Sequence, residues 1–461
     1  MDQQNIADRR ENTLVVPDSP FGIVRGFLYG HMGAKADVFM PQVHQLGAGL
    51  VRLFLFWSQV EPERGRFVWD AIDTFLEQLE PTDDAWITLN SSSLWGTRQS
   101  TNFQPPSPAL RLDEYYHFVF RLVSHCRGRV RYWQCDNEPT NPLLWAGTAQ
   151  EYANQLKVFA RAVKDADLGA VVVLAGAVDA FHTQGPDTQV EQEFFDYLLR
   201  ESVNDFDVFD LHLYGDLYAI PANIKAVRQK MAALGYHKPI YVGEYNGPSF
   251  FNFAENLPIL QRIFERMGTS PQGEALAQAT QSEMVATLYQ QMADLPAQAQ
   301  MFMEGCPPEL EQKRHRINCR ELVTRSLLAL SEGVQKMLCW NLANEKVDRY
   351  NLMHLLFDKH KFLDYEKGVF KEPYPAAGTF RRMVHMLAGI EQVQRIEIPE
   401  RPAIYLFEVR RRERGPLLVV WERRDTFGGE ENPAVSFEWP WSTSKAQAID
   451  VFGEAVSIQV D

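Results

Sequence analysis

Eight short runs rich in β-branched and aromatic residues recur along the chain, and each is followed by a segment with helical spacing. The runs are GIVRGFLYG (22–30), LVRLFLFW (50–57), AWITLNSS (85–92), VRYWQCDNE (130–138), AVVVLAGA (170–177), DVFDLHLY (207–214), PIYVGEYN (239–246) and QKMLCWNL (335–342). Strands that alternate with helices in this way predict an α/β fold, a closed parallel (β/α)8 TIM barrel. An open doubly wound sheet is the alternative, but no glycine-rich phosphate loop follows a strand.

One helical segment illustrates the pattern. Apolar residues recur on one face of 148–163, at Tyr152, Leu156, Phe159 and Val163. Thr148 opens the segment and Glu151 follows three residues later, which predicts a capping box.

The residue pattern changes near the end of the chain, where strand-like runs follow one another without helical segments between them. The runs AIYLFEVRR (403–411), GPLLVVWERRD (415–425), AVSFEWPW (434–441) and AQAIDVFG (446–453) read as strands joined by turns. We therefore expect the barrel over 21–391 and a small C-terminal β-sandwich module over 392–461. The extension 1–20 can add a strand to this module through TLVV at 13–16.

The connection between the seventh and eighth runs is far longer than a βα unit needs. We expect a helical insertion over about 248–315, leaving from the end of strand seven and lying over the C-terminal face of the barrel. One of Phe250, Phe251 and Phe253 is expected to form a wall of the pocket, and Phe251 is our choice.

Charge and composition exclude several classes of partner. The formal net charge is -14, which disfavours nucleic acid and anionic membranes. No apolar stretch is long enough to span a bilayer, and no apolar signal region follows the N-terminus. The five cysteines follow neither a zinc nor a disulfide pattern, so we expect a cytoplasmic protein with reduced thiols. The oligomeric state is left open.

Two carboxylates stand at the ends of apolar runs, Glu138 in RYWQCDNEP and Glu244 in PIYVGEYN. Alone, each has an ordinary interpretation as a helix cap or a solvated loop residue. Together, they would face one barrel mouth and provide the proton donor and the nucleophile or base of glycosidic bond cleavage. Asn137 adds an amide suited to a sugar hydroxyl, and Pro139 biases Glu138 away from the α region.

These motifs resemble a known group of enzymes. The segments W..DNEP...LWAGTAQEYANQLKVFARAVKDAD, VFDLHLYGD and PIYVGEYNG resemble clan A of the glycoside hydrolases, and most of all family 39, the β-xylosidase and α-L-iduronidase group. The segment VRLFLFWSQVEPERGRFVWDAIDTFL at 51–76 resembles the strand-two region of the clan. The likeness runs from strand two to strand eight, and the small β module fits it too.

The resemblance implies roles for matching residues. Glu138 would be the general acid/base and Glu244 the nucleophile. The remaining implied contacts are Asn137 to the sugar 2-hydroxyl, Arg52 near the nucleophile, His212 and Tyr214 in the same subsite, and Trp340 as a stacking platform.

Each implied contact has a structural alternative. Arg52 can pair with a core carboxylate, His212 can be a satisfied core histidine, and Trp340 can pack in the core. Trp95, like Trp57, follows a strand end and is a candidate for either substrate binding or packing.

The sequence departs from the family at Asp136, where an aromatic residue is usual before Asn-Glu-Pro. Strand alternation turns Asp136 away from Glu138, so we expect a structural role for it. The long insertion is a second departure, and it leaves the substrate class open.

The main hypothesis is a retaining glycoside hydrolase that acts on a carbohydrate substrate by double displacement, without a metal or organic cofactor. A catalytically silent sugar-binding barrel is the first alternative, and a metal-dependent barrel enzyme is the second. A retaining mechanism predicts a separation of about 5–5.5 Å between the two carboxyl groups.

Overall fold

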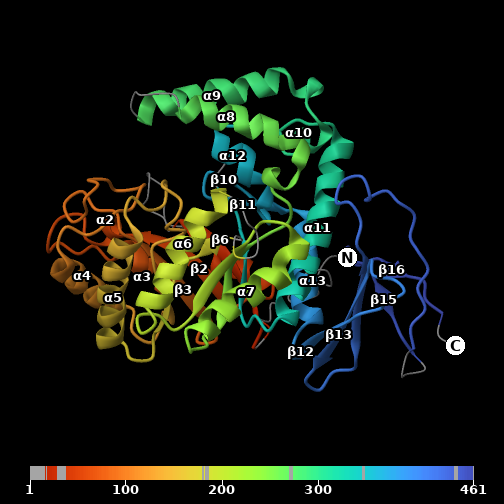
Figure 1. Ribbon diagram of the computed structural model, residues 1–461, viewed down its shortest axis with the longest axis horizontal. Coiled ribbons are helices and arrows are strands. Elements are labelled where there is room, and N and C mark those ends of the chain that lie inside the picture. The colour runs from red at the N-terminus through yellow and green to blue at the C-terminus, as the bar shows by residue number, and fades with distance from the viewer. Residues whose placement is uncertain are drawn as a thin grey trace, which may run out of the picture. The chain divides into compact units, whose positions relative to one another are not determined.

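The computed structural model describes residues 16, 18–27, 38–178, 181, 186–268, 274–344, 348–440 and 445–459. The chain divides into two compact units (Figure 1). The first unit runs to Tyr245 and includes Leu328–Leu342, and the second comprises Asn246–Leu327 and Ala343–Asp461. The domain boundaries predicted from the sequence stay a prediction.

The first unit is the predicted (β/α)8 barrel. Its parallel strands in the described part of the chain are β1 (Phe21–Phe27), β2 (Leu50–Phe56), β3 (Asp84–Asn90), β4 (Tyr132–Cys135), β5 (Val171–Val173), β6 (Ala177–Val178), β7 (Phe209–Leu213), β8 (Ile240–Tyr245) and β9 (Met337–Trp340). Their order is β5-β4-β3-β2-β1-β9-β8-β7-β6. The predicted fifth strand is split into β5 and β6, which form the two ends of this order. A parallel bridge from Val173 to Val208 links β5 to the segment before β7, so the ring closes.

Helices alternate with these strands. They are α1 (Met40–Gln45), α2 (Trp57–Val60), α3 (Asp70–Leu76), α4 (Leu112–His125), α5 (Ala149–Ala166), α6 (Pro186–Glu201) and α7 (Ile220–Ala233). Figure 1 shows α4 and α5 side by side in orange and yellow. The capping box of α5 is confirmed, because Thr148 Oγ1 accepts from the Glu151 amide (3.2 Å) and Glu151 Oε2 from the Thr148 amide (2.8 Å). Such a cap contributes about 1 kcal/mol.

Apolar side chains fill both sides of the barrel wall. The predicted α5 face, Tyr152, Leu156, Phe159 and Val163, is fully buried. Inside the barrel lies a second cluster, formed by Val24, Leu50, Phe54, Trp86, Tyr132, Val173, Val208 and Leu338. Complete burial of each large apolar side chain contributes about 1.5–3 kcal/mol. Apolar side chains therefore fill much of the barrel interior, and the polar groups buried there are the exception.

The second unit contains the helices of the insertion and the C-terminal sheets. Its helices are α8 (Leu257–Gly268), α9 (Glu274–Gln290), α10 (Ala297–Gln300), most of α11 (Pro308–Ser331), α12 (Leu352–Phe357) and α13 (Pro375–Met386). A hairpin of β10 (Leu363–Glu366) and β11 (Val369–Pro373) precedes α13. Helices α8 to α12 share a hydrophobic core in which Phe250 and Phe253 both pack against Phe302.

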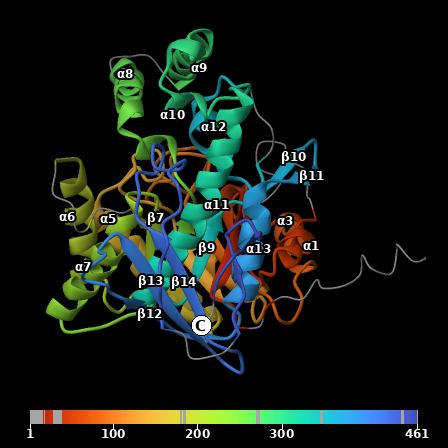
Figure 2. The ribbon, with the colours of Figure 1, turned by 90° about the vertical axis from the view of Figure 1, so that its right-hand side faces the viewer.

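The C-terminal β-sandwich module contains small antiparallel sheets. β12 (Ile390–Ile396), β13 (Ile404–Arg411) and β14 (Leu417–Glu422) form one sheet (Figure 2), and β15 (Ala448–Ile449) pairs with β16 (Ala455–Val456). Trp421 stacks on Tyr405 and Phe407, with ring centroids 5.5 and 5.0 Å apart. Glu430 accepts from Arg316 and Arg320, which ties the module to α11.

Two details of the tail differ from the prediction or lie outside the described residues. The strand expected over 434–441 does not form in 434–440, where Trp439 instead stacks on Phe437. A tryptophan-proline pair at 439–440 lacks one ladder amide, which disfavours pairing. Trp441 and the N-terminal segment 13–15 lie outside the described residues.

Candidate active site

The predicted site residues of the barrel come from different strands, three of them at or just beyond the carboxyl end of their strand. Arg52 lies on β2, Glu138 follows β4, His212 lies on β7, and Glu244 lies on β8 in register with His212. The carboxyl ends of parallel strands in one barrel converge on one mouth. Glu138, His212 and Glu244 meet there for this reason, and Arg52, the third residue of β2, reaches Glu244 through its long side chain.

The turn that carries Glu138 is conformationally unusual. β4 ends at Cys135, and both Asp136 (φ 54°) and Glu138 (φ 38°) adopt positive φ. Glu138 is thus outside the right-handed α region, as Pro139 predicts, but in the left-handed region. Each such residue costs about 1–2 kcal/mol. Packing that offsets this cost fixes the direction of the Glu138 side chain.

Arg52 organises the site from the centre. Its guanidinium is fully buried. It donates to Thr88 Oγ1 (2.9 Å), Gln134 Oε1 (2.7 Å), Asn137 Oδ1 (2.8 Å), the Gly243 carbonyl (3.0 Å) and Glu244 Oε1 (2.9 Å). The guanidinium also lies over the rings of Phe54 and Trp86. It therefore fixes both the Asn137 amide and the Glu244 carboxylate, and no other side chain has its rigid fork of donors.

His212 links the two glutamates. Its Nδ1 lies 2.6 Å from Glu138 Oε1 and 3.8 Å from Glu244 Oε2, and its Nε2 lies 3.1 Å from Asp210 Oδ2. Burial by itself would lower the pKa of His212, but the carboxylates of Glu244, Asp210 and Glu138 outweigh it and raise the pKa to about 10. The ring is therefore an imidazolium at neutral pH, with both nitrogens donating.

Glu244 is buried, and its pKa is raised overall, although several neighbouring groups stabilise its anion. Burial raises the pKa of Glu244, while the positive charges of His212 and Arg52 act in the opposite direction. Tyr214 donates to Glu244 Oε2 at 2.8 Å. Burial, together with the nearby charge of Glu244, raises the pKa of Tyr214 well above its usual range, so the hydroxyl keeps its proton.

Asp136 points away from this network. It accepts from the Ser91 amide (2.6 Å) and the Ser91 hydroxyl (2.8 Å), and Gln155 donates to it at 3.3 Å. Burial raises its pKa to about 7. Asp136 thus joins the segment after β4 to the segment after β3, which is the structural role expected from strand alternation.

Sequence reasoning missed three residues that hold the site together. Asp210 accepts from His212, from Gln134 Nε2 (2.7 Å) and from the Gly243 amide (2.6 Å), and Thr88 donates to Gln134 Oε1. A signal was present, because Asp210, His212 and Tyr214 alternate at i, i+2 and i+4 and therefore share one face of β7.

Two glycines make room for this network. A Cβ on Gly176 would lie 2.7 Å from His212 Cδ2 and closer still to Nε2. A Cβ on Gly243 would lie 2.5 Å from Asp210 Oδ1. Any larger residue at either position must displace a buried side chain of the site.

Some polar atoms near the mouth are unpaired. Asn90 ends β3 on the face that carries Trp86 and Thr88, and Trp340 ends β9. Neither Asn90 Nδ2 nor Trp340 Nε1 has a hydrogen-bond partner among the described residues, although both atoms are buried. Since an unpaired buried donor costs about 1–3 kcal/mol, these atoms are suited to a polar ligand.

Two further predicted contacts are Trp95, in the first unit, and Phe251, in the second. Trp95 donates to the Glu61 carbonyl (3.0 Å) and packs edge-on against the buried Trp57. Phe251 lies in the second unit and is 40% exposed, whereas the neighbouring Phe250 is buried. Substrate binding by Trp95 and Phe251 stays a prediction.

One ligand atom each from Glu138, His212 and Glu244 lies within 4.8 Å of the others, which is close enough for a metal ion to be considered. The residues fit such an ion poorly. The guanidinium of Arg52 lies 2.9 Å from Glu244 Oε1, and both His212 nitrogens are engaged with carboxylates. A cation there would compete with an arginine and an imidazolium.

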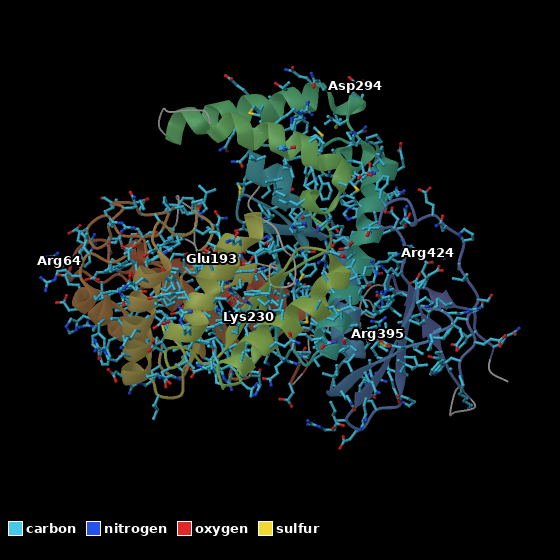
Figure 3. All side chains as sticks on the ribbon, viewed as in Figure 1. Arg64, Glu193, Lys230, Asp294, Arg395 and Arg424 are labelled. Atoms are coloured by element: carbon cyan, nitrogen blue, oxygen red, sulfur yellow. The ribbon has the colours of Figure 1, made fainter. Side chains whose placement is uncertain are left out.

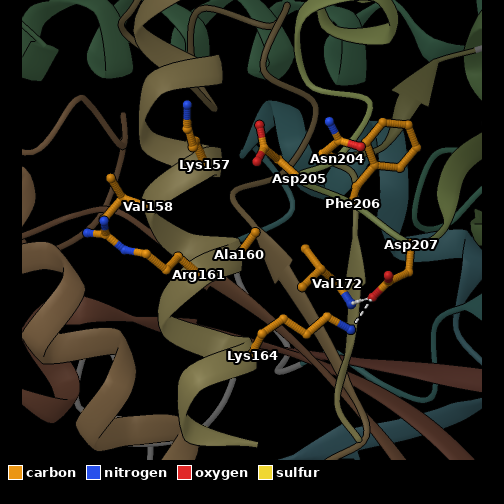
Figure 4. A pocket seen from close by; sticks show the side chains of 10 residues that line it. All are labelled: Lys157, Val158, Ala160, Arg161, Lys164, Val172, Asn204, Asp205, Phe206 and Asp207. Carbon is orange, nitrogen blue, oxygen red and sulfur yellow. Dashed lines mark hydrogen bonds and ion pairs between the residues drawn. The ribbon is translucent and has the colours of Figure 1, made fainter. Parts of the chain in front are cut away.

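The first unit also has a cavity of about 310 Å³ away from these residues (Figure 4). It lies between α5 and the segment before β7, with Val172 of β5 in its wall, so it is near the amino ends of the strands. Lys164 crosses part of it to pair with Asp207 at 2.7 Å. In barrels this end contributes to stability, whereas chemistry occurs at the opposite mouth.

No helix in the described ranges is long and apolar enough to cross a membrane.

The fold and the layout of these strand ends define a (β/α)8 barrel of the kind found in glycoside hydrolases. A family 39 glycoside hydrolase from the gut symbiont Bacteroides cellulosilyticus WH2 matches with a TM-score of 0.63 at 13% identity, covering 97% of this chain and 79% of that one. A glucosidase from Croceicoccus marinus matches with a TM-score of 0.50 at 15% identity, covering 86% and 75%.

The sequence resembles family 39, and a solved structure of a family 39 enzyme has a similar fold. At these identities the likeness shows the fold. No family model and no curated protein matches the chain.

Proposed function

We propose that the protein is a retaining glycoside hydrolase in which Glu244 is the nucleophile and Glu138 the general acid/base. The observation that carries this proposal is the pairing of the two carboxylates across His212, with oxygens within 4.8 Å of one another. Oxygens this near one another agree better with the about 5–5.5 Å between the carboxyl groups of retaining enzymes than with the about 6.5–9.5 Å of inverting ones. Closely spaced carboxylates favour direct attack by one of them, since an inverting enzyme needs a wider gap to hold the attacking water.

The environments of the two glutamates support different roles. Glu244 receives hydrogen bonds from Arg52 and Tyr214, one on each oxygen, which favours the anion that attacks the anomeric carbon. Glu138 is held by His212 at Oε1 alone among the described residues, so Oε2 is available to carry a proton to the leaving oxygen. Its side chain is also the more exposed of the two, at 14% against 7%.

The reaction then has two steps. Glu244 attacks the anomeric carbon, the bond to the leaving oxygen breaks, and Glu138 gives that oxygen its proton, which leaves a glycosyl ester on Glu244. Glu138 next removes a proton from water, the water oxygen bonds to the anomeric carbon, and the ester bond breaks to restore both carboxyl groups. The Asn137 amide, oriented by Arg52, is positioned to donate to the 2-hydroxyl.

A carbohydrate is therefore the proposed substrate, and Asn90 and Trp340 supply free donors for its hydroxyl groups. Two of the proteins with a similar fold are a family 39 glycoside hydrolase and a glucosidase, which agrees with this class. The sugar is left to experiment.

The test begins with a screen of chromogenic aryl glycosides. Glu244→Ala should abolish turnover, and azide should restore part of it as an inverted glycosyl azide. Glu138→Ala should keep the first step for good leaving groups and give a retained azide product. Because Glu244→Ala leaves Arg52 without its charge partner, the isosteric Glu244→Gln provides the folded comparison.

Exposed Glu193→Ala on α6 is the control and should match the parent enzyme. Near-parental activity of both Glu138→Ala and Glu244→Ala on every glycoside cleaved would disprove the assignment. Binding without turnover would point to the silent barrel, and loss of activity with a chelator would point to the metal-dependent one.

A further inference from the structure

A third carboxylate, Glu191, stands behind the turn that carries Glu138. Glu191 lies in the first turns of α6, outside the network centred on Arg52. Its Oε2 accepts from the Thr140 hydroxyl at 3.0 Å, and its Oε1 accepts from the Val178 amide at 2.6 Å. One side chain therefore joins α6, the end of β6 and the loop after β4.

The link from Thr140 to Glu138 is short and stiff. Pro139 alone separates the two residues, and its ring fixes φ. The Asn141 amide donates to the Glu138 carbonyl at 2.9 Å, and this hydrogen bond closes the turn formed by residues 138–141. Since Glu138 has a strained φ of 38°, contacts around it must supply the energy that holds it. The anchor of Thr140 is one of these contacts.

Glu191 is also close enough to the site to exchange electrostatic effects with it. Burial raises its pKa to about 7, the hydrogen bonds from Thr140 and Val178 lower it, the charge of Glu138 raises it and that of His212 lowers it. Since it is a partly buried carboxylate, replacing it changes both the hydrogen bonds of the loop and the charge beside Glu138.

We propose that Glu191 is a positioning residue for the acid/base: through Thr140 and Val178 it holds the turn so that Glu138 is aimed at the glycosidic oxygen. The proposal rests on the role of Glu138 proposed above. Glu191 does not touch the substrate. It acts on proton transfer, because small displacements of a proton donor are costly to the rate.

Three variants separate this role from simple stabilisation. Thr140→Val removes the hydroxyl while keeping the shape of the side chain. Glu191→Gln keeps the shape of Glu191 but removes its charge and one acceptor. Glu193→Gln is the matched control, because Glu193 lies on the same helix (Figure 3), is exposed, and is bonded to Gln189 on that helix at 2.7 Å.

The measurement is kcat/KM on aryl glycosides whose leaving groups differ in acidity, since a poor leaving group needs the proton of Glu138 and a good one does not. We expect Thr140→Val and Glu191→Gln to lower kcat/KM about 10- to 100-fold for poor leaving groups. This is a partial loss of the about 10²–10⁴-fold rate increase that acid catalysis supplies. For the best leaving group the loss should be less than about 3-fold. Glu191→Gln should also move the basic limb of the pH profile to lower pH, because a negative charge beside the proton donor is lost.

Equal losses for all leaving groups in both variants, or no loss in either, would overturn the proposal while leaving the proposed function intact. If Glu191→Gln failed to fold, as judged by circular dichroism and its urea midpoint, Thr140→Val would decide the question alone. A parent protein without activity on any glycoside would instead disprove the proposed function and this role with it.

Discussion

Substitution of Gly176 by alanine adds one methyl group at a position of the barrel that has no space for it. Gly176 lies between β5 and β6, and the added Cβ would meet the His212 ring, 2.7 Å from Cδ2. Carbon atoms in contact normally lie about 3.5–4.0 Å apart, so the ring or the backbone must move by about 1 Å. His212 has no free direction, because it is fully buried and bonded at both nitrogens.

The size of the effect follows from these distances. A shift of about 1 Å is enough to break a hydrogen bond of 2.6 or 3.1 Å, and a comparable misplacement in an active site costs about 100-fold in rate. Overpacking of this kind also lowers the free energy of unfolding by about 1–3 kcal/mol. We therefore expect Gly176→Ala to fold, to lose about 1–3 kcal/mol of stability and to lose about 100-fold in kcat/KM.

The assay pairs urea unfolding with kinetics on an aryl glycoside. Gly169→Ala is the control, because Gly169 lies in the same unit and its added Cβ would meet only Asp167 Oδ1 at an ordinary 3.4 Å. The control should stay within about 0.5 kcal/mol of the parent and keep its activity. A Gly176→Ala variant with parental stability and kinetics would refute the reasoning, since it would mean that His212 can move without consequence.

Further predictions concern Asp136, Asn90 and the insertion. The Asp136 carboxyl has a pKa of about 7 in the folded protein and about 4 in the unfolded chain, so it loses its proton at lower pH when the chain is unfolded. The free energy of unfolding therefore falls by up to about 4 kcal/mol as pH rises from about 4 to 7. Asp136→Asn removes that fall, so urea midpoints measured across this range should depend less on pH than in the parent, and parallel curves would contradict the assignment. Asn90→Ala should lower kcat/KM about 10-fold on the preferred glycoside without loss of stability, because the unpaired Asn90 Nδ2 is expected to donate to the substrate. An unchanged kcat/KM would exclude a hydrogen bond from Asn90 to the substrate. Buried Phe250→Ala in the insertion should cost about 3–5 kcal/mol in urea unfolding, whereas Phe251→Ala, at a side chain 40% exposed, should cost much less; equal losses would contradict this prediction.

Much of the site could be predicted from the sequence because local rules determine it. The alternation of strand and helix patterns predicts the barrel, and a barrel brings the ends of all its strands to one mouth. Glu138, Glu244 and His212 each stand at or near such an end, so their meeting follows from topology. Arg52 lies lower on β2, and its contact with Glu244 depends on its long side chain. The cap at Thr148 and the outward turn of Asp136 were predictable for the same reason, since both depend on residues close in sequence.

The tertiary structure decided everything that depends on distances between strands. No local pattern marks Gly176 as the space for His212, because the two residues are brought together only when β6 pairs with β7. The tail strand predicted at 434–441 does not form over 434–440 for a related reason, since pairing also needs a partner edge that the sequence does not specify. Glu191 reads as an ordinary helix residue until the fold sets it against Thr140 and Val178. The sequence determines which groups face the mouth, and long-range packing determines which of them touch, because contact needs a precision of a few tenths of an ångström that periodicity does not carry.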